Sequence, residues 1–268
     1  TGPYKELSGF GSPGTAFSGV TYLLGFPVRP PVSPSFSLAD YVAGLNAVIG
    51  TMIALYNRDA LGGKGQEVDV SLYESLFRMM ETIVAEYHVT GKVKERTPKM
   101  SGSASPSGTF QTKDGKWVVL VCSTNRTFEY LSNAMGRHDE LIPKYADTPQ
   151  RLADDAYITK LTSDWCLSMN WSELKETCHK FGVPVDLVYS IEDIYNDPQY
   201  QARHDIVEVP CDDFGTMKMP AVAPLLSETP GEILWAGEKM GSRNEEIYKG
   251  LLKLDDAKIQ ELKEKNVI

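Results

Sequence analysis

A stiff, proline-rich segment that changes abruptly into a helical pattern is the feature that most constrains this chain. Residues 1–37 are rich in glycine, proline and serine. Four prolines lie within residues 26–34, where their fixed φ angles and missing N–H groups exclude a helix and favour an extended loop. From Asp40 onward, apolar residues recur at steps of three and four, at Tyr41, Leu45, Val48, Ile49, Met52, Ile53 and Tyr56. This spacing predicts a helix that starts near Asp40, buries one broad face and ends at the glycines of residues 61–65.

The following residues predict a strand and a second helix. Residues 68–70 alternate like a short strand, and Ser71 with Glu74 three residues later fits a capping box. Apolar residues then continue at helical spacing over residues 72–87. Residues 91–106 are polar and basic, so we expect a linker and a domain boundary there.

The second half of the chain opens with a predicted hairpin. Asp114 and Gly115 form a strong tight-turn signal between two apolar, strand-like runs that end at residue 121. Helices are expected over 126–135 and 171–181, and Asn170 with Glu173 three residues later opens the second of them. The remaining expected elements are a strand-like break at 183–185, a short helix capped by Ser190, short strands within 199–235 and a polar helix from Asp255.

Charge and composition exclude several classes of protein. With 268 residues and a net charge of −9, the chain is unsuited to nucleic acid or an anionic membrane as its main partner. No stretch approaches the eighteen apolar residues of a membrane span, and residues 1–4 (TGPY) lack the basic and then apolar run of a signal peptide. The four cysteines are widely spaced and the four histidines lack metal-ligand spacing. We therefore expect a cytoplasmic protein with reduced thiols and no metal.

A series of local motifs indicates a protein family, which composition alone does not. In order along the chain these are residues 39–45 (ADYVAGL), 63–74 (GKGQEVDVSLYE), the 108–117 hairpin, 182–185 (GVPV), 197–203 (DPQYQAR), 220–224 (PAVAP) and 254–259 (LDDAKI). Together they resemble the family III coenzyme A transferases, with the greatest similarity to the carnitine CoA-transferase branch. The turn from Gly241 to Glu245 departs from the family pattern, so its role stays open.

The resemblance implies an α/β fold. It would consist of part of a nucleotide-binding large domain and a smaller α+β domain, in a dimer of interlocked rings. The implied division is residues 1–100 in the large domain with the catalytic Asp, 101–198 in the small domain, and 199–268 returning to the large domain. The resemblance further implies a segment before Thr1, so we expect an N-terminally truncated chain that needs this segment or a separate chain that supplies it.

The resemblance assigns catalysis to Asp40. Its carboxylate would attack an acyl-CoA and pass through an acyl anhydride and an aspartyl-CoA thioester, with the coenzyme A thioester as substrate and no permanently bound cofactor. A carboxylate is ionised at neutral pH and needs no general base, and a helix start offers backbone amide donors. The alternative for Asp40 alone is a helix N-cap.

A serine-rich stretch occupies the position of the family's active-site loop. By position, Ser101, Gly102 and Ser103 resemble the glycine run that covers the intermediates in formyl-CoA transferases. Here serine replaces most of those glycines, so an interdomain linker is an equal alternative.

Two other functions remain open. An α-methylacyl-CoA racemase would share the fold, but its acidic residue after the small-domain hairpin is replaced by Asn125, and an amide cannot exchange a proton at neutral pH. A non-catalytic subunit of a hetero-oligomeric transferase is the second alternative. The identity of the acyl group cannot be read from these residues.

Overall fold

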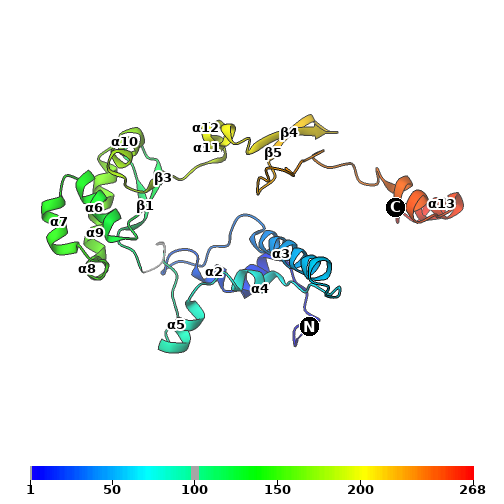
Figure 1. The fold of residues 1–268 in the computed structure, drawn as a ribbon, viewed down its shortest axis with the longest axis horizontal. Coiled ribbons are helices and arrows are strands. Elements are labelled where there is room, and N and C mark those ends of the chain that lie inside the picture. Colours follow the sequence, from blue (N-terminus) through cyan, green and yellow to red (C-terminus); the bar gives the residue numbers. More distant parts are fainter. Residues whose placement is uncertain (1, 98–102) are drawn as a thin grey trace. The chain divides into compact units, whose positions relative to one another are not determined.

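The computed structural model describes residues 2–97 and 103–268, which divide into two compact units, Thr1–Val188 and Tyr189–Ile268. Figure 1 shows the order of the elements along the chain. The first unit contains α1 (Gly11–Phe17), α2 (Val20–Leu23), α3 (Leu38–Ala60), α4 (Leu72–Phe77), α5 (Ile83–Thr90), β1 (Ser107–Gln111), β2 (Trp117–Val121), α6 (Asn125–Ala134), α7 (His138–Tyr145), α8 (Thr148–Ala153), α9 (Asp155–Leu167), α10 (Trp171–Phe181) and β3 (Val185–Leu187). The second contains α11 (Ile191–Asn196), α12 (Pro198–Ala202), β4 (Ile206–Cys211), β5 (Gly215–Pro220), the π-helix η1 (Glu245–Leu251) and α13 (Asp256–Glu264).

Helix α3 confirms the predicted helix but not its buried face. It spans Leu38–Ala60, and Ala39 and Ala43 are its buried residues. The seven apolar side chains that define its periodicity are instead 57–69% exposed. The expectation of a broad buried face is therefore wrong for this chain, because the helix packs through small residues near its start.

The composition of α3 also corrects the statement that no segment is apolar enough to span a membrane. Its 23 residues contain an 18-residue window with a mean hydropathy of 1.6, so it could cross a membrane by length and composition. Core helices of soluble proteins pass the same test, and one such helix is weak evidence.

Two expectations for the chain after α3 are wrong. Residues 68–70 form no strand in the described part of the chain; Val68 packs on α3, where a Cβ added to Gly50 would lie 2.8 Å from its Cγ1. The predicted continuous helix over 72–87 is split into α4 and α5, with Glu81 in a left-handed conformation between them. Ser71 caps α4 as predicted, because its hydroxyl accepts a hydrogen bond from the Glu74 amide at 3.2 Å.

Helices α1 and α2 lie in a stretch that sequence patterns describe as a glycine- and proline-rich loop. Helix α1 contacts both α3 and α4. A Cβ added to Gly14 would lie 3.0 Å from Leu72 Cβ, so the missing side chain permits close packing of α1 on α4. Phe17 also meets Tyr73 edge to face, with ring centroids 4.8 Å apart.

The hairpin prediction is confirmed. Strands β1 and β2 pair antiparallel from Ser107 with Val121 to Gln111 with Trp117, and β3 extends the sheet on the other edge of β2. The Asp114 carboxylate in the turn accepts hydrogen bonds from the Thr112 hydroxyl and from the Trp171 amide at the start of α10. The turn therefore fixes the hairpin against α10.

Helices α6–α10 gather around this sheet (Figure 1) and share one hydrophobic core. The predicted helices correspond to α6 and α10, and Asn170 with Glu173 forms the expected capping box. Helices α7, α8 and α9 were not predicted. The core residues are Phe110, Val118, Leu120, Cys122, Phe128, Leu131, Leu141, Ile158, Cys166, Leu174, Cys178 and Val183.

A fully buried arginine connects the elements of this core. The Arg151 side chain is 0% exposed, and its guanidinium donates to the carbonyl oxygens of Ser105, Tyr145 and Ala146, each at 2.9 Å. It also donates to Asn125 Oδ1 at 3.0 Å and lies 4.7 Å from the centre of the Phe128 ring. Its charge is stabilised by oriented oxygens rather than by a buried carboxylate.

The second unit matches its predicted short elements. Strands β4 and β5 form an antiparallel hairpin from Ile206 with Pro220 to Cys211 with Gly215. Ser190 caps α11 as predicted, and the predicted polar helix is α13, which Asp255 caps. The three-part division of the chain inferred from the family resemblance stays a prediction.

We expect Arg151→Met to lower the free energy of unfolding by about 3 kcal/mol, because several buried acceptors would lose their donor. Chemical denaturation followed by tryptophan fluorescence measures this change. Arg126→Met is the matched control, since Arg126 is exposed and donates to the Tyr130 hydroxyl on its own helix. Equal effects of the two substitutions would contradict a structural role for Arg151.

The cysteines provide a second test of the core. Burial raises the pKa of Cys122, Cys166 and Cys178 to about 12, whereas Cys211 is partly exposed. A raised thiol pKa stabilises the fold below the ordinary value of about 8.5, and this contribution is lost as pH rises towards 12. At pH 8, Ellman's reagent should react rapidly with one thiol, and Cys211→Ser should remove that phase. Rapid reaction of the buried thiols would contradict this packing.

Candidate functional site

Asp40 lies in the first turn of α3, where the sequence predicts it. It is the third residue of the helix, and Ser37 occupies the N-cap position, so Asp40 is not the N-cap. Its side chain is exposed, and within residues 2–97 and 103–268 no hydrogen bond or ion pair engages its carboxylate. A carboxylate in the first turn of a helix is favoured by the helix dipole. The Asp40 carboxylate is thus accessible and unpaired among the described residues.

A cavity of about 490 Å³ opens beside this carboxylate. Its wall is formed by the start of α1, the end of the proline-rich segment and the first turn of α3. Hydroxyl groups predominate among the lining side chains. The lining residues are Phe10, Gly11, Ser12, Thr15, Ser33, Pro34, Ser35, Phe36, Ser37, Leu38 and Asp40.

Gly11, the first residue of α1, lies against the Asp40 carboxyl group. A Cβ added there would collide with Oδ2 and lie 3.0 Å from Cγ and 3.2 Å from Oδ1 of Asp40. The carboxylate therefore rests against the bare Cα of Gly11. Sequence patterns missed this residue, because the glycine-, proline- and serine-rich composition of residues 1–37 indicates no helix at residue 11. The available signal was the pair Gly11 and Gly14, three positions apart on one helix face.

Of the three predicted active-site loop residues, only Ser103 lies within the described residues. Ser101 and Gly102 are outside the described residues, and Ser103 is an exposed turn residue. The segment that follows is not a free linker: Ala104 and Ser105 are buried, and the Ser105 hydroxyl donates to Asp155 Oδ1 at 2.8 Å. The predicted linker therefore ends before residue 104.

Asn125 occupies a structural position at the start of α6. Its amide donates to Asp147 Oδ1 at 3.0 Å, and its Oδ1 accepts hydrogen bonds from Arg151 and from the Thr148 hydroxyl. Both ends of the amide are thus engaged in holding α6 and α8. These contacts suit a structural side chain, not one that exchanges a proton with a substrate.

In the described residues, no group of three or more His, Cys, Asp or Glu side chains could hold a metal ion. The lining of the cavity itself supplies a carboxylate next to hydroxyl groups.

Comparison with known proteins establishes the family. Residues 1–244 match the sequence profile of CoA-transferase family III. The chain belongs to CoA-transferase family III. Over its whole length it is 40% identical to the succinyl-CoA–L-malate CoA-transferase beta subunit of Chloroflexus aurantiacus and 35% identical to the succinyl-CoA–D-citramalate CoA-transferase of the same organism. It covers 67% of each of these two proteins.

Solved structures agree with this assignment. A CAIB/BAIF family protein from Brucella suis superposes with a TM-score of 0.76 at 25% identity, covering 94% of this chain and 65% of that one. The chain spans 59–67% of the length of the first four curated relatives. The mixed α/β architecture and the family resemblance are thereby confirmed, whereas the interlocked dimer stays a prediction.

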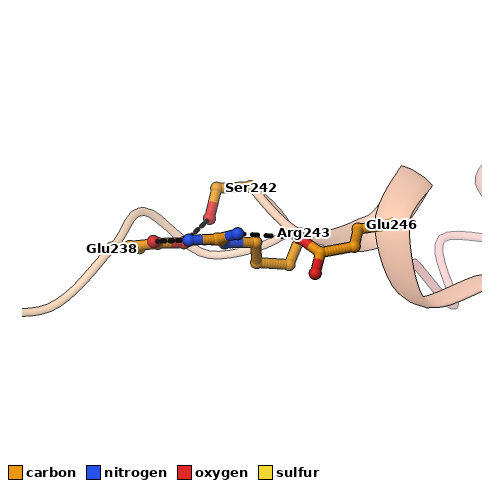
Figure 2. A network of polar contacts seen from close by, with 4 residues as sticks. All are labelled: Glu238, Ser242, Arg243 and Glu246. Carbon is orange, nitrogen blue, oxygen red and sulfur yellow. Dashed lines mark hydrogen bonds and ion pairs between the residues drawn. The ribbon is translucent and has the colours of Figure 1, made fainter.

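The turn that departs from the family pattern forms an exposed ion network. Figure 2 shows Arg243 between Glu238 and Glu246, with its Nε donating to Glu238 Oε2 and its Nη1 to Glu246 Oε2, both at 2.7 Å. The Ser242 hydroxyl also donates to Glu238. The Arg243 guanidinium and then the Ser242 hydroxyl lower the pKa of Glu238 to about 2. These contacts give the turn a local structural role.

We expect Arg243→Gln to return the pKa of Glu238 towards its ordinary value of about 4.3. The depressed pKa contributes stability above about pH 4.3, which is lost as pH falls towards 2. Titration of the Glu238 carboxyl carbon by NMR measures the change. Lys239→Gln is the control, because Lys239 pairs with Asp213 instead. An unchanged Glu238 titration in Arg243→Gln would refute the network.

Proposed function

We propose that the protein is a CoA-transferase that moves coenzyme A from an acyl-CoA donor to a carboxylic acid acceptor, with Asp40 as the nucleophile. The observation that carries this proposal is the Asp40 carboxylate, unpaired among the described residues and exposed in the first turn of α3 beside an open cavity. Family membership supports the same activity.

The proposed reaction proceeds by two exchanges at carbonyl carbons. An Asp40 oxygen attacks the thioester carbonyl of the donor, the carbon–sulfur bond breaks, and coenzyme A leaves as a thiolate from a mixed anhydride. The thiolate then attacks Cγ of Asp40 and expels the donor acid as a carboxylate, which leaves an aspartyl-CoA thioester. The acceptor carboxylate reverses both steps, so that acceptor acyl-CoA and free Asp40 are formed.

A carboxylate suits these exchanges for a physical reason. The aspartyl-CoA thioester contains the same type of bond as the donor and product acyl-CoA, so coenzyme A is exchanged without loss of the free energy of the thioester. Each attack develops negative charge on a carbonyl oxygen, and backbone amides at a helix start together with hydroxyl groups can stabilise it. The hydroxyl-rich wall of the cavity supports this role.

For the substrates, we propose small polar carboxylic acids. Relatives covering the whole of this chain are named for succinyl-CoA, L-malate and D-citramalate. The four serine residues and one threonine lining the cavity offer hydrogen-bond donors and acceptors to hydroxyl and carboxylate groups. Comparing kcat/KM for succinyl-CoA and for a long-chain acyl-CoA tests this preference.

The proposal also concerns assembly. Two relatives are named as alpha and beta subunits of a succinyl-CoA–L-malate CoA-transferase, so a pair of different chains and an interlocked homodimer are both compatible with this family. Native mass spectrometry of the purified assembly distinguishes the heterodimer from the homodimer.

Two further features belong to the same proposal. Ser101, Gly102 and Ser103 would cover the reaction intermediates, and the protein would be located in the cytoplasm.

The contacts of Asn125 favour a transferase over a racemase. An acid or base at this position would have to exchange protons, whereas the amide is engaged at both ends by Asp147 and Arg151. A non-catalytic subunit is disfavoured because such a subunit has no need of an unpaired carboxylate beside a cavity.

We expect Asp40→Asn to reduce CoA transfer at least about 10³-fold, because an amide cannot form the anhydride. Transfer is measured by chromatography of the acyl-CoA products in the protein at its full natural length. Asp59→Asn is the control, since Asp59 pairs with Arg58 near the end of α3. Transfer by Asp40→Asn at a near wild-type rate would refute the assignment.

Trapping provides a direct test of the intermediate. After incubation with acyl-CoA, hydroxylamine should convert Asp40 into a hydroxamate that mass spectrometry locates in the peptide containing residues 38–45. A racemase would instead introduce solvent deuterium at the acyl α-carbon, and a non-catalytic subunit would produce neither signal.

A further inference from the structure

We infer that Gly11 is a positioning residue for Asp40: its missing side chain leaves the space in which the Asp40 carboxylate is held and converted to its acyl derivatives. This inference rests on the proposed function. It identifies a residue on α1 that acts through Asp40 rather than on the substrate directly.

The backbone gives no reason for glycine at this position. Gly11 is the first residue of α1, and its φ lies outside the left-handed range that side chains avoid. Alanine would be accepted there and would favour the helix, because glycine is among the poorest helix formers. The reason for a glycine must therefore be found in its surroundings.

Gly11 is next to the carboxyl group of Asp40, which is the reacting group in the proposed function. All three atoms nearest to an added Cβ belong to the Asp40 carboxyl group: Oδ2 in collision, Cγ at 3.0 Å and Oδ1 at 3.2 Å. At Gly14, one turn along the same face, the nearest atoms are instead the side-chain carbons of Leu72 and Ala39. The two glycines thus share a face of α1, but Gly11 alone of this pair meets a titratable group.

A methyl group at Gly11 would displace the nucleophile. The Asp40 carboxyl is the end of a short side chain, so it can rotate away from the added Cβ without unfolding α1 or α3. Such a movement changes the direction from which an oxygen attacks the thioester. In addition, Cγ becomes tetrahedral when the thiolate attacks it, and the added methyl would occupy part of the required space. A misplacement of about 1 Å can cost on the order of 10²-fold in rate.

The experiment compares Gly11→Ala with Gly9→Ala in the protein at its full natural length. Gly9 is exposed, and an added Cβ there meets nothing within 4 Å, so it is the matched control. We expect Gly11→Ala to lower kcat by about 10- to 100-fold while the KM for acyl-CoA changes by less than about twofold. The yield of the Asp40 hydroxamate should fall in parallel, and Gly9→Ala should retain wild-type values.

A double-mutant cycle on thermal stability tests the contact independently of activity. In an Asp40→Ala background the collision is absent, so Gly11→Ala should raise Tm through its better helix propensity. In the wild-type background the same substitution should lower Tm or leave it unchanged. The same Tm shift in both backgrounds would show that Gly11 and Asp40 do not interact and would overturn the inference.

The outcomes separate this inference from the proposed function. If Asp40→Asn abolishes transfer while Gly11→Ala retains the wild-type kcat, the positioning role is wrong and the proposed function stands. If Asp40→Asn retains transfer, the proposed function is wrong, and the stability cycle still decides whether the two residues are in contact.

Discussion

The close packing of α1 on the first turn of α3 is the contact on which the candidate site depends. It is possible because small residues meet there: Gly11 and Gly14 from α1, and Ala39 from α3. A side chain at Gly14 would press on Leu72 of α4, whereas one at Gly11 would displace the Asp40 carboxylate from its place beside α1. Phe17, packed against Tyr73, then fixes α1 on α4. Local packing of minimal side chains therefore places the nucleophile proposed for catalysis.

Sequence patterns predicted the elements whose signals are local. The start of α3, the hairpin around Gly115 and the caps of α4 and α10 follow from helical periodicity, turn chemistry and capping residues, all of which depend on a few neighbouring positions. Asp40 was found in this way together with its family motif. Its role as nucleophile, however, came from the resemblance, because an aspartate at a helix start is compatible with several functions.

The features that sequence patterns missed depend on tertiary contacts. Helix α1 contains two glycines and a proline, which usually break helices, and its stability comes from packing against α3 and α4. Conversely, the apolar periodicity of α3 predicts burial, yet periodicity cannot say which surface covers it, and Ile49 and Tyr56 are exposed in this chain. Gly11 could not be recognised as part of the site until its distance from Asp40 was known.

The contacts of a polar side chain indicate whether it stabilises the fold or is available for a reaction. Arg151 is fully buried and donates to backbone and side-chain oxygens on several elements, so its charge is already used to stabilise the fold. Asn125 belongs to the same network. Asp40, by contrast, has no partner among the described residues and lines an open cavity. An ion pair or a hydrogen bond from a backbone amide would stabilise its carboxylate, but neither is present among these residues. An unpaired carboxylate beside the bare Cα of Gly11 leaves its oxygens available for bond formation, which the proposed role as nucleophile requires.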